Sequence, residues 1–528
     1  MLNKFNNYLL AVNLFGRLLG LNCLIAFISL MIQLPGLISD HGLFPVSKIF
    51  THTEIMQSNW FICPSLVWLM PNLTAMIFLG FLGTVLASLT MFGYLRGLVF
   101  LLMYILYLSL CKACGPFTEF QWDALLLESC FLAVFLYPFR LGLRSPQANI
   151  AKPNPYILPL YWFLLFKLML GSGLVKLTNG DNSWMQLQAL WYHFATQPLP
   201  NPIAYIFNQL PHMLLDLGVI LVLVIELVFP FFIFINQRLR ILAAGCFIFL
   251  QLLIAFTGNY AFFNLLTITL SILLLNDEFL TKIIPHQFLN LIQLKLPPTK
   301  SNLITTSKNN IQNLNPELLT LISSEDSKLN SRKGFQLNKL GHIFKLCLPL
   351  SLLMLGIIKL GHSLNLVYEL PFSQIIENTI DPFLIDNSYG LFAVMTKTRP
   401  EIIIEGSCDG INFYEYTFKF KPGPLNRVPP IIAPYQPRLD WQLWFIALDE
   451  NNLSPILKNL VSALMQNYQP VLALLDKNPF PDKPPTIIKV YLYDYHFTNF
   501  KQLLNTGNFW TRDHKREYFE VKKQIFKQ

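Results

Sequence analysis

The sequence predicts a polytopic α-helical membrane bundle of about nine spans, followed by an extracytosolic α+β domain with a β-sheet. The first observation is composition, because 53% of the 528 residues are hydrophobic and only 13% are charged, unlike an average soluble protein. The second is that apolar runs of near span length recur from residue 14 to 276 and again at 342–361. The third is a change after residue 362 to segments with strand-like alternation.

The predicted spans are apolar runs that approach the roughly 20 residues needed to cross a bilayer. They lie near residues 14–34, 73–92, 97–111, 122–139, 157–177, 213–235, 238–257, 260–276 and 342–361. The first run carries Arg17 and is not followed by a small-residue cleavage site, so we expect a retained span. The transmembrane core with its extracytosolic loops is thus predicted over residues 1–278, and the last span over 342–362.

Basic residues in the loops predict the orientation. One set of loops carries most of them: Arg96, then Arg140, Arg144 and Lys152, then Arg238 and Arg240, then a Lys-rich stretch from Lys282 to Lys345. The other loops offer Lys48, Lys112 and Lys176. Basic loops favour the cytosolic side, so we expect a cytosolic N-terminus and an extracytosolic C-terminal domain. The membrane would be that of the endoplasmic reticulum in a eukaryote, or the cytoplasmic membrane in a bacterium.

Residues 279–341 are rich in Asn, Ser, Lys and Leu and lack sustained apolar periodicity, which predicts a flexible cytosolic linker. Residues 363–500 are the predicted α+β domain. Within it we expect a β-hairpin around the Cys-Asp-Gly turn at 408–410, helices at 441–448 and 454–467, and a strand at 486–498. The charged tail 501–528 is expected to be loosely ordered.

Charge and motifs exclude several functions. The net charge of +9 is scattered among loops without a nucleic-acid-binding motif, so membrane lipids are the expected partners of these basic residues. P-loop, GxGxxG and HExxH patterns are absent, and we expect neither a cofactor nor a metal. Cys111 and Cys114 form a CxxC pair at the outer end of the third predicted span. They could form a local disulfide or be a chance pair, since a thioredoxin-like context for catalysis is absent.

Three ionisable residues fall near the middle of predicted spans. Counting along their helices, Glu128, Lys167 and Glu226 lie about 13 to 17 Å deep. A lone charge there is costly, so we expect Lys167 to pair with Glu128 or Glu226 and the remaining carboxylate to be protonated. The group is either a structural clamp or a proton, ion or catalytic site.

Two aromatic blocks are not needed to span a bilayer and are candidates for a functional surface. The first, residues 176–211, contains Asp181 and Trp184, which could cap and anchor an interfacial helix, the polar pair His193 and Gln197, and Pro198 in the stiff exit from that helix. A structural role for this block is an interfacial helix that seals the bundle.

The second block, PYQPRLDWQLWF at residues 434–445, contains Arg438 and Asp440, which we expect to pair across a turn. Trp441 and Trp444 are three residues apart and share a helix face, where they either pack a core or contact a partner. We expect the functional surface to form where residues 184–202 meet residues 438–445.

These two blocks, together with FQWDALLLE (Phe120 to Glu128) and RPEIIIEGSCDG (Arg399 to Gly410), resemble the lipase maturation factor family. The likeness runs in order from about Leu14 to Phe497, with a break around 280–380. It implies a membrane-embedded, chaperone-like factor that helps secreted homodimeric lipases mature in the endoplasmic reticulum, with a secreted lipase-like protein as client. This chain has Lys167 where the family usually has Arg, and Ala195 where it usually has Glu.

Two alternatives remain at this stage. One is a membrane enzyme, since the bundle is distantly similar to the γ-carboxylase and DoxX-like groups. The other is a proton-coupled transporter that uses the buried Glu and Lys charges. A quinone or lipid bound in the bundle would favour the enzyme, and a water-filled path through the membrane would favour the transporter.

Overall fold

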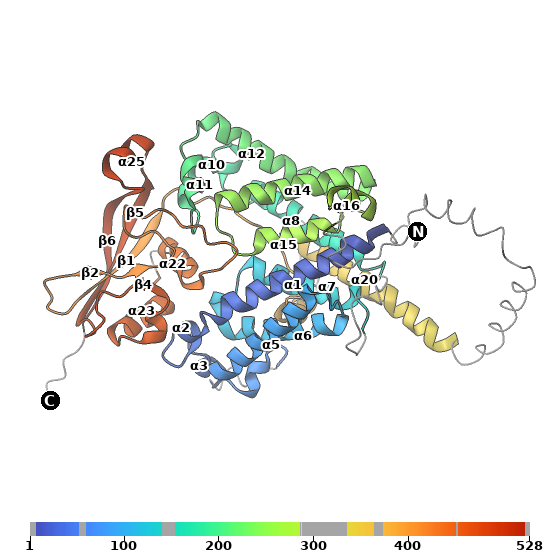
Figure 1. The fold of residues 1–528 in the computed structure, drawn as a ribbon, viewed down its shortest axis with the longest axis horizontal. Helices are drawn as coiled ribbons and strands as arrows, with labels where there is room; N and C mark the ends of the chain where they lie inside the picture. The colour runs from blue at the N-terminus through green and yellow to red at the C-terminus, as the bar shows by residue number, and fades with distance from the viewer. Residues whose placement is uncertain are drawn as a thin grey trace, which may run out of the picture.

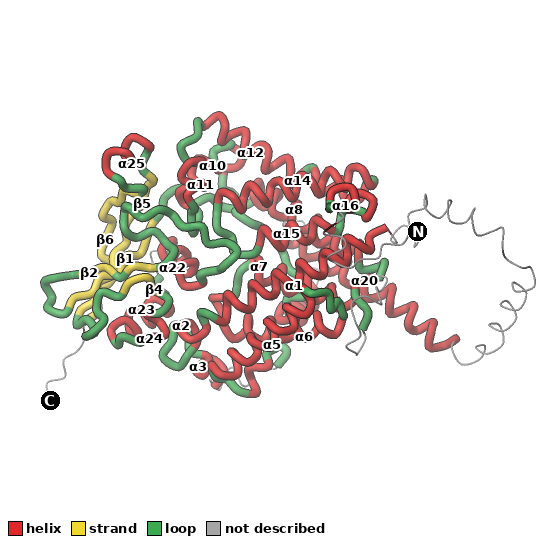
Figure 2. Tube along the Cα trace, viewed as in Figure 1, coloured by secondary structure: helices red, strands yellow, loops and turns green. Residues whose placement is uncertain are grey.

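The computed structural model describes residues 7–51, 60–139, 154–285, 287, 335–363, 373–449 and 452–522. Figure 1 shows a large helical bundle with a smaller part at one end of it, and Figure 2 shows that the strands lie in this smaller part. Short helices and loops cover the end of the bundle that faces the strands.

Apolar sequence with few helix breakers gives the bundle its main helices, most of which are long. These are α1 (Leu9–Met31), α5 (Leu73–Met91), α6 (Gly97–Cys114), α7 (Gln121–Leu136), α8 (Leu158–Thr178), α12 (His212–Leu227), α13 (Phe229–Ile235), α14 (Gln237–Thr257), α15 (Phe263–Ile272), α16 (Asp277–Ile283) and α20 (Phe335–Ser363). Shorter elements between them are α2 (Leu34–Ile38), α3 (Val46–Thr51), η2 (Leu66–Leu69), η3 (Gly115–Phe117), α9 (Asn182–Met185), α10 (Ala189–Thr196) and α11 (Pro202–Phe207).

Among the described residues, six helices are long and apolar enough to cross a membrane, or seven if the bent pair α15 and α16 counts as one span. The prediction of nine spans therefore exceeds what the structure supports. The run at 122–139 forms only the 16-residue α7. The run at 260–276 forms the 10-residue α15, which meets α16 at an angle of 119°. The run at 342–361 lies in α20, whose apolar part is Cys347–Gly361.

Burial separates the inner helices from the outer ones. About seven tenths of the apolar windows of α6 and α8 are buried (67% and 72%), whereas only 28% is buried in α5, in α12 with α13, and in α14. The outer helices expose large apolar side chains such as Phe78, Leu221 and Phe249. In water this surface would be costly, so these faces are suited to contact lipid.

Long-range contacts define the two ends of the bundle. At one end the Asp277 carboxylate accepts hydrogen bonds from the backbone N–H groups of Leu9 and Leu10, both at 2.9 Å. Arg240 donates to the Tyr8 hydroxyl at 3.0 Å at the same end. Because α1 and α14 both begin here, the basic residue before α6 and those in the first turn of α14 lie at the end opposite the strands (Figure 1).

After α20, α21 (Ser373–Ile380) and η6 (Asp381–Phe383) precede a segment that returns into the bundle. Asp386 pairs with Lys167 of α8, and a Cβ added to Gly171 would lie 2.7 Å from the Tyr389 carbonyl oxygen. The Trp184 indole then donates to the Phe392 carbonyl at 2.9 Å. Residues 386–392 thus run along α8 to its C-terminal end. This segment, which belongs to the C-terminal domain predicted from residue 363, is packed against α8.

The C-terminal domain contains a four-stranded antiparallel sheet in the order β2-β1-β5-β6, formed by β1 (Pro400–Ser407), β2 (Tyr414–Glu415), β5 (Ile487–Phe497) and β6 (Trp510–Lys522). β3 (Thr417–Phe418) pairs with β4 (Leu475–Lys477). Its helices are α22 (Arg438–Leu448), α23 (Pro455–Met465), α24 (Gln469–Leu472) and α25 (Phe500–Thr506). The predicted hairpin is confirmed by the pairing of Glu405 with Glu415, as are the helices at 441–448 and 454–467 and the strand at 486–498.

The expectation of a loosely ordered tail from residue 501 is wrong for residues up to 522. α25 has a capping box, in which the Asn499 and Gln502 side chains bond to each other's backbone N–H groups. β6 then pairs with β5 along its whole length. The many charges of β6 misled the prediction, because a strand at the edge of a sheet tolerates charged side chains. Most of the predicted linker 279–341, including Lys300, lies outside the described residues, as do Arg140, Arg144 and Lys152.

Candidate functional site

The two aromatic blocks meet where the bundle contacts the C-terminal domain. The Trp444 indole donates a hydrogen bond to the Thr196 carbonyl at 3.0 Å. Trp441 packs edge-on against Trp122, with ring centres 4.9 Å apart, and against Tyr260 at 6.3 Å. We call the set Phe120, Trp122, Tyr260, Trp441, Trp444 and Phe445 the aromatic joint.

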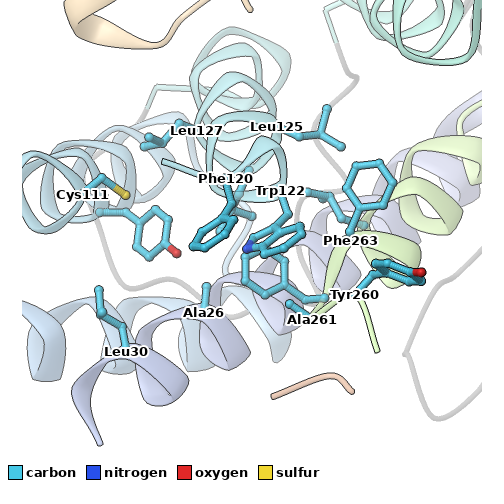
Figure 3. Packing of buried hydrophobic residues seen from close by; sticks show 14 of the residues in the cluster. Ala26, Leu30, Cys111, Phe120, Trp122, Leu125, Leu127, Tyr260, Ala261 and Phe263 are labelled. Atoms are coloured by element: carbon cyan, nitrogen blue, oxygen red, sulfur yellow. The ribbon is translucent and has the colours of Figure 1, made fainter. Parts of the chain in front are cut away.

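The bundle side of the aromatic joint is formed by two stacked rings, those of Phe120 and Trp122. Phe120 and Trp122 lie at the start of α7, and their rings stack with centres 4.7 Å apart. Figure 3 shows these two side chains among the buried residues of the bundle, with Tyr260 on a neighbouring segment. Phe120, Trp122, Tyr260 and Trp441 are buried, whereas Phe445 is 44% exposed. The joint is therefore a packed core with an exposed rim at Phe445.

His193 and Gln197 contact the same tyrosine. The Tyr260 hydroxyl donates to Gln197 Oε1 at 2.7 Å and lies 3.2 Å from His193 Nε2. Gln197 Nε2 donates to the Thr257 carbonyl at 2.8 Å. Burial, with a smaller contribution from the nearby Lys176 charge, lowers the pKa of His193 to about 4. His193 is therefore neutral near pH 7, and the side chain of Gln197 is a buried structural link.

Asp181, Trp184 and Pro198 hold the first block in place. Asp181 caps α9 through the Ser183 N–H at 3.0 Å and accepts the Met395 N–H at 2.7 Å. Burial alone would raise the pKa of Asp181, but the hydrogen bonds from these backbone donors lower it below its usual value. Trp184 is 3% exposed. The Pro198 carbonyl accepts a hydrogen bond from Arg399 at 2.8 Å. These predicted residues therefore contribute contacts within the fold.

Arg399 was missed as a site residue. Its side chain is fully buried and donates to the carbonyls of Ala195 and Pro198, at 2.9 and 2.8 Å, and to that of Gln197. It also pairs with Glu401 at 2.8 Å. Burial lowers its pKa, while the Glu401 charge opposes that effect. Arg399 directly precedes β1, so its side chain connects the segment that follows α10 to the sheet.

The predicted pairing of Arg438 with Asp440 is wrong. Arg438 lies at the start of α22 and contacts Asp123 of α7 through two N···O distances of 3.1 and 3.2 Å. It also donates to the Phe117 carbonyl. Asp440 instead accepts the backbone N–H groups of Phe420 and Lys421 at 3.0 and 2.9 Å. Residues two apart on a helix face different directions, which is why these two charges have separate partners.

Lys167 and Glu128 are joined by a buried ion pair at 2.8 Å. Lys167 also pairs with Asp386. The second oxygen of Glu128 accepts the Asn387 N–H at 2.9 Å and the Tyr389 hydroxyl at 2.8 Å. This cluster therefore joins α7 and α8 to the returning segment 386–392.

Glu226 does not join that cluster. It pairs with Lys176 at 2.6 Å, nine residues beyond Lys167 and so about 13 Å further along α8. The reason is close helix packing, because a Cβ added to Gly173 would lie 2.9 Å from the Glu226 Cβ. Lys176, predicted to lie in a loop, instead lies in the last turn of α8.

The CxxC pair forms no disulfide. Cys111 and Cys114 are free thiols, 5% and 0% exposed, within the hydrophobic core. Such burial keeps both thiols away from oxidants in solution. Among the described residues, no group of three His, Cys, Asp or Glu side chains is arranged to hold a metal.

The missed residues Asp123, Asp386 and Arg399 share one property. Each is a charge embedded in a mainly apolar or turn-rich stretch, and each is buried and paired in the structure. The available signal was the cost of burying such a charge without a partner. It could have marked the residues as buried ions without naming their partners.

The spanning helices, their apolar outer faces and the aromatic joint define an integral membrane protein whose helical bundle is tied to a C-terminal domain with a β-sheet. A family model described as the lipase maturation factor transmembrane domain matches residues 10–282, and one described as its C-terminal domain matches residues 385–520. The chain belongs to the lipase maturation factor family.

Individual relatives cover nearly the whole chain. It is 33% identical to lipase maturation factor 2 of Xenopus tropicalis and 32% identical to that of Homo sapiens, each over 94% of this chain and 80% of the relative. It is 30% identical to lipase maturation factor 1 of Mus musculus, over 95% of this chain and 85% of the relative. No solved structure gives a significant match.

Proposed function

We propose that this protein is a membrane-embedded maturation factor for lipases, acting in the endoplasmic reticulum if the organism is eukaryotic. The observation that carries the proposal is the family match over both the bundle and the C-terminal domain. Relatives named lipase maturation factor 2 and lipase maturation factor 1 align with 94% and 95% of this chain. The membrane-enzyme and transporter alternatives gain no support from these relatives.

The C-terminal domain faces the extracytosolic side in this proposal. Three basic residues lie at the end of the bundle away from the sheet. Arg96 directly precedes α6, Arg238 lies in the first turn of α14, and Lys282 lies in the last turn of α16. Basic residues favour the cytosolic side of a membrane. The aromatic joint then lies on the side where a secreted client would be encountered.

The client contacts the rim of the aromatic joint around Phe445. An exposed aromatic side chain at the edge of a packed cluster is typical of a binding hot spot. The buried contacts of Arg438 and Arg399 hold the two walls of the joint in place, which lowers the entropy cost of binding. The previously expected contact residues His193 and Gln197 are poorer candidates, because Gln197 is buried and hydrogen-bonded within the fold.

The test is the substitution Phe445→Ser in the full-length protein, with Ile411→Ser as matched control. Ile411 is 82% exposed in the turn between β1 and β2, outside the aromatic joint. Cells that lack other maturation factors are supplied with each variant and a homodimeric lipase, and secreted lipase activity is measured per amount of variant.

We expect Phe445→Ser to lower that activity about tenfold or more, corresponding to a loss of at least about 1.4 kcal/mol of binding. Ile411→Ser should leave the activity unchanged. Equal activities for the two variants would show that the joint rim is not the client surface. No activity with the wild-type chain would argue against the maturation function itself.

A further inference from the structure

The helix α25 of the C-terminal domain has an apolar face that is open in the part of the chain that the structure describes. The helix has seven residues, and none of them is buried. Phe500 is 50% exposed and Leu504 is 86% exposed. These two residues are four apart, so their side chains lie on the same face of the helix. Exposed apolar faces usually mark a contact with a partner or a membrane.

Side-chain contacts fix the position of α25 beside the bundle. The carbonyl of Thr498, two residues before the helix, accepts a hydrogen bond from the Gln209 side chain at 3.1 Å. The Thr498 hydroxyl lies 3.3 Å from that of Tyr205. The Tyr205 ring also packs edge-on against Phe500, with ring centres 5.8 Å apart. α25 is therefore attached to α11 and to the loop that leads into α12.

This attachment lies close to the lipid headgroups. α12 and α13 together form an apolar span of 24 residues, His212–Ile235. At about 1.5 Å per residue the span is about 36 Å long, whereas the hydrocarbon core of a bilayer is about 30 Å thick. The first turn of α12 therefore reaches the edge of the hydrocarbon. Gln209 is only three residues before α12, so it lies within about 10 Å of that edge.

The exposed apolar surface of the outer span continues toward α25. Met213 and Leu217 of α12 are 70% and 53% exposed, and Ile206 of α11 is 51% exposed. Figure 1 shows α12 and α25 at the same edge of the molecule. The face of Phe500 and Leu504 thus follows directly from a surface that is suited to contact lipid.

We propose that α25 inserts this face among the lipids of the adjacent leaflet and docks the C-terminal domain on the membrane surface. The partner of this face is a lipid surface and not a client protein. Lys501 is exposed beside Phe500, and its long side chain can reach the headgroup phosphates while its methylene groups stay on apolar surface. The sheet then has two attachments, one to the bundle through the aromatic joint and one to lipid through α25.

The test uses the full-length protein in phosphatidylcholine vesicles. The variant Leu504→Cys carries a nitrobenzoxadiazole dye, in a background where the other cysteines are replaced. Ile411→Cys with the same dye is the matched control, because Ile411 is also highly exposed, at 82%, and lies in the turn between β1 and β2. A phosphatidylcholine with a nitroxide on its headgroup quenches dyes that lie at the membrane surface. Vesicles without the nitroxide give the reference emission.

We expect the dye at position 504 to lose about half or more of its emission in the nitroxide vesicles, because an inserted helix lies within the headgroup layer. The dye at position 411 should keep nearly all of its emission. Both substitutions replace exposed side chains, and thermal unfolding checks that both variants are folded.

Similar quenching at the two positions, including none at either, would overturn the proposal. It would also be overturned if the dye at position 504 were unquenched in lipid and became shielded from water only on addition of a homodimeric lipase, since the face would then bind client. The quenching does not depend on lipase maturation, so its failure is distinct from a failure of the proposed function.

Discussion

Single buried arginines connect the two parts of this protein. Arg438 places a positive charge from the C-terminal domain beside Asp123, and Arg399 binds three carbonyl groups at the exit of α10. Arginine suits both places because its planar guanidinium offers five donors in a fixed geometry. Removing either side chain would leave buried acceptors or a carboxylate without a partner, so substitutions here report on folding more than on client binding.

His193 predicts a pH dependence of stability. Its pKa in the folded protein is about 4, because burial and the Lys176 charge disfavour the protonated form, whereas an unfolded histidine titrates near 6.5. The unfolded state thus binds more protons between these values, and the free energy of unfolding falls as the pH falls from about 6.5 to about 4. Above about 6.5 this contribution is constant.

The measurement is chemical unfolding of the purified protein between pH 7 and 4, compared with His193→Gln. We expect the wild-type protein to lose on the order of 1 to 3 kcal/mol more than the variant over this range. Glutamine can still hydrogen-bond to Tyr260 but does not titrate. Parallel stability curves for the two proteins would contradict the assignment.

At the scale of elements, small residues let the segment 386–392 and α12 approach α8. Gly171 faces the Tyr389 carbonyl oxygen and Gly173 faces Glu226, each at a distance that leaves no room for a Cβ. Small residues at such positions are typical of helix contacts in membranes, because they allow backbones to come close. The Gly-Ser-Gly run in α8 is thus explained by packing.

Gly171→Ala should destabilise the protein by about 1 to 3 kcal/mol, since backbone atoms must move to admit the methyl group. Gly245→Ala in α14 is the matched control, because a Cβ there would meet nothing within 4 Å and alanine favours a helix by up to about 1 kcal/mol. Thermal unfolding in detergent measures both. Equal effects of the two substitutions would mean that the contact with Tyr389 is not tight.

At the scale of the whole molecule, the proposed orientation predicts which thiols react from outside a sealed vesicle. Cys408 is an exposed native cysteine in the C-terminal domain, and Lys282, with a side chain that is 68% exposed, lies in α16 at the opposite end. In sealed vesicles with the extracytosolic face outward, an impermeant maleimide should label Cys408 at once. It should label the variant Lys282→Cys at position 282 only after permeabilisation, in a background where the other cysteines are replaced.

Labelling of position 282 but not of Cys408 in intact vesicles would indicate the opposite orientation, with the aromatic joint on the cytosolic side. Labelling of both positions in intact vesicles would indicate leaky vesicles or a different arrangement of spans. A control with membrane-permeant maleimide establishes that both thiols are reactive.

Local patterns in the sequence were enough to predict the membrane bundle, the hairpin at 400–415, the helices α22 and α23 and the strand β5. Each of these depends on apolar run length, periodicity or turn residues within one segment. The sequence blocks were also enough to indicate the family. Span counting was less successful, because α7 and α15 are apolar but short, and an apolar segment buried within a bundle has the same local pattern as a span.

Only the tertiary structure decided which buried charges pair. Arg438 meets Asp123, which is 315 residues away in the chain, and Asp386 meets Lys167 across 219 residues. The sequence indicates that a buried charge needs a partner, because an unpaired one is too costly. It does not specify the partner, because that depends on the return of residues 386–392 along α8 and on the docking of α22 onto α7, which no local pattern encodes.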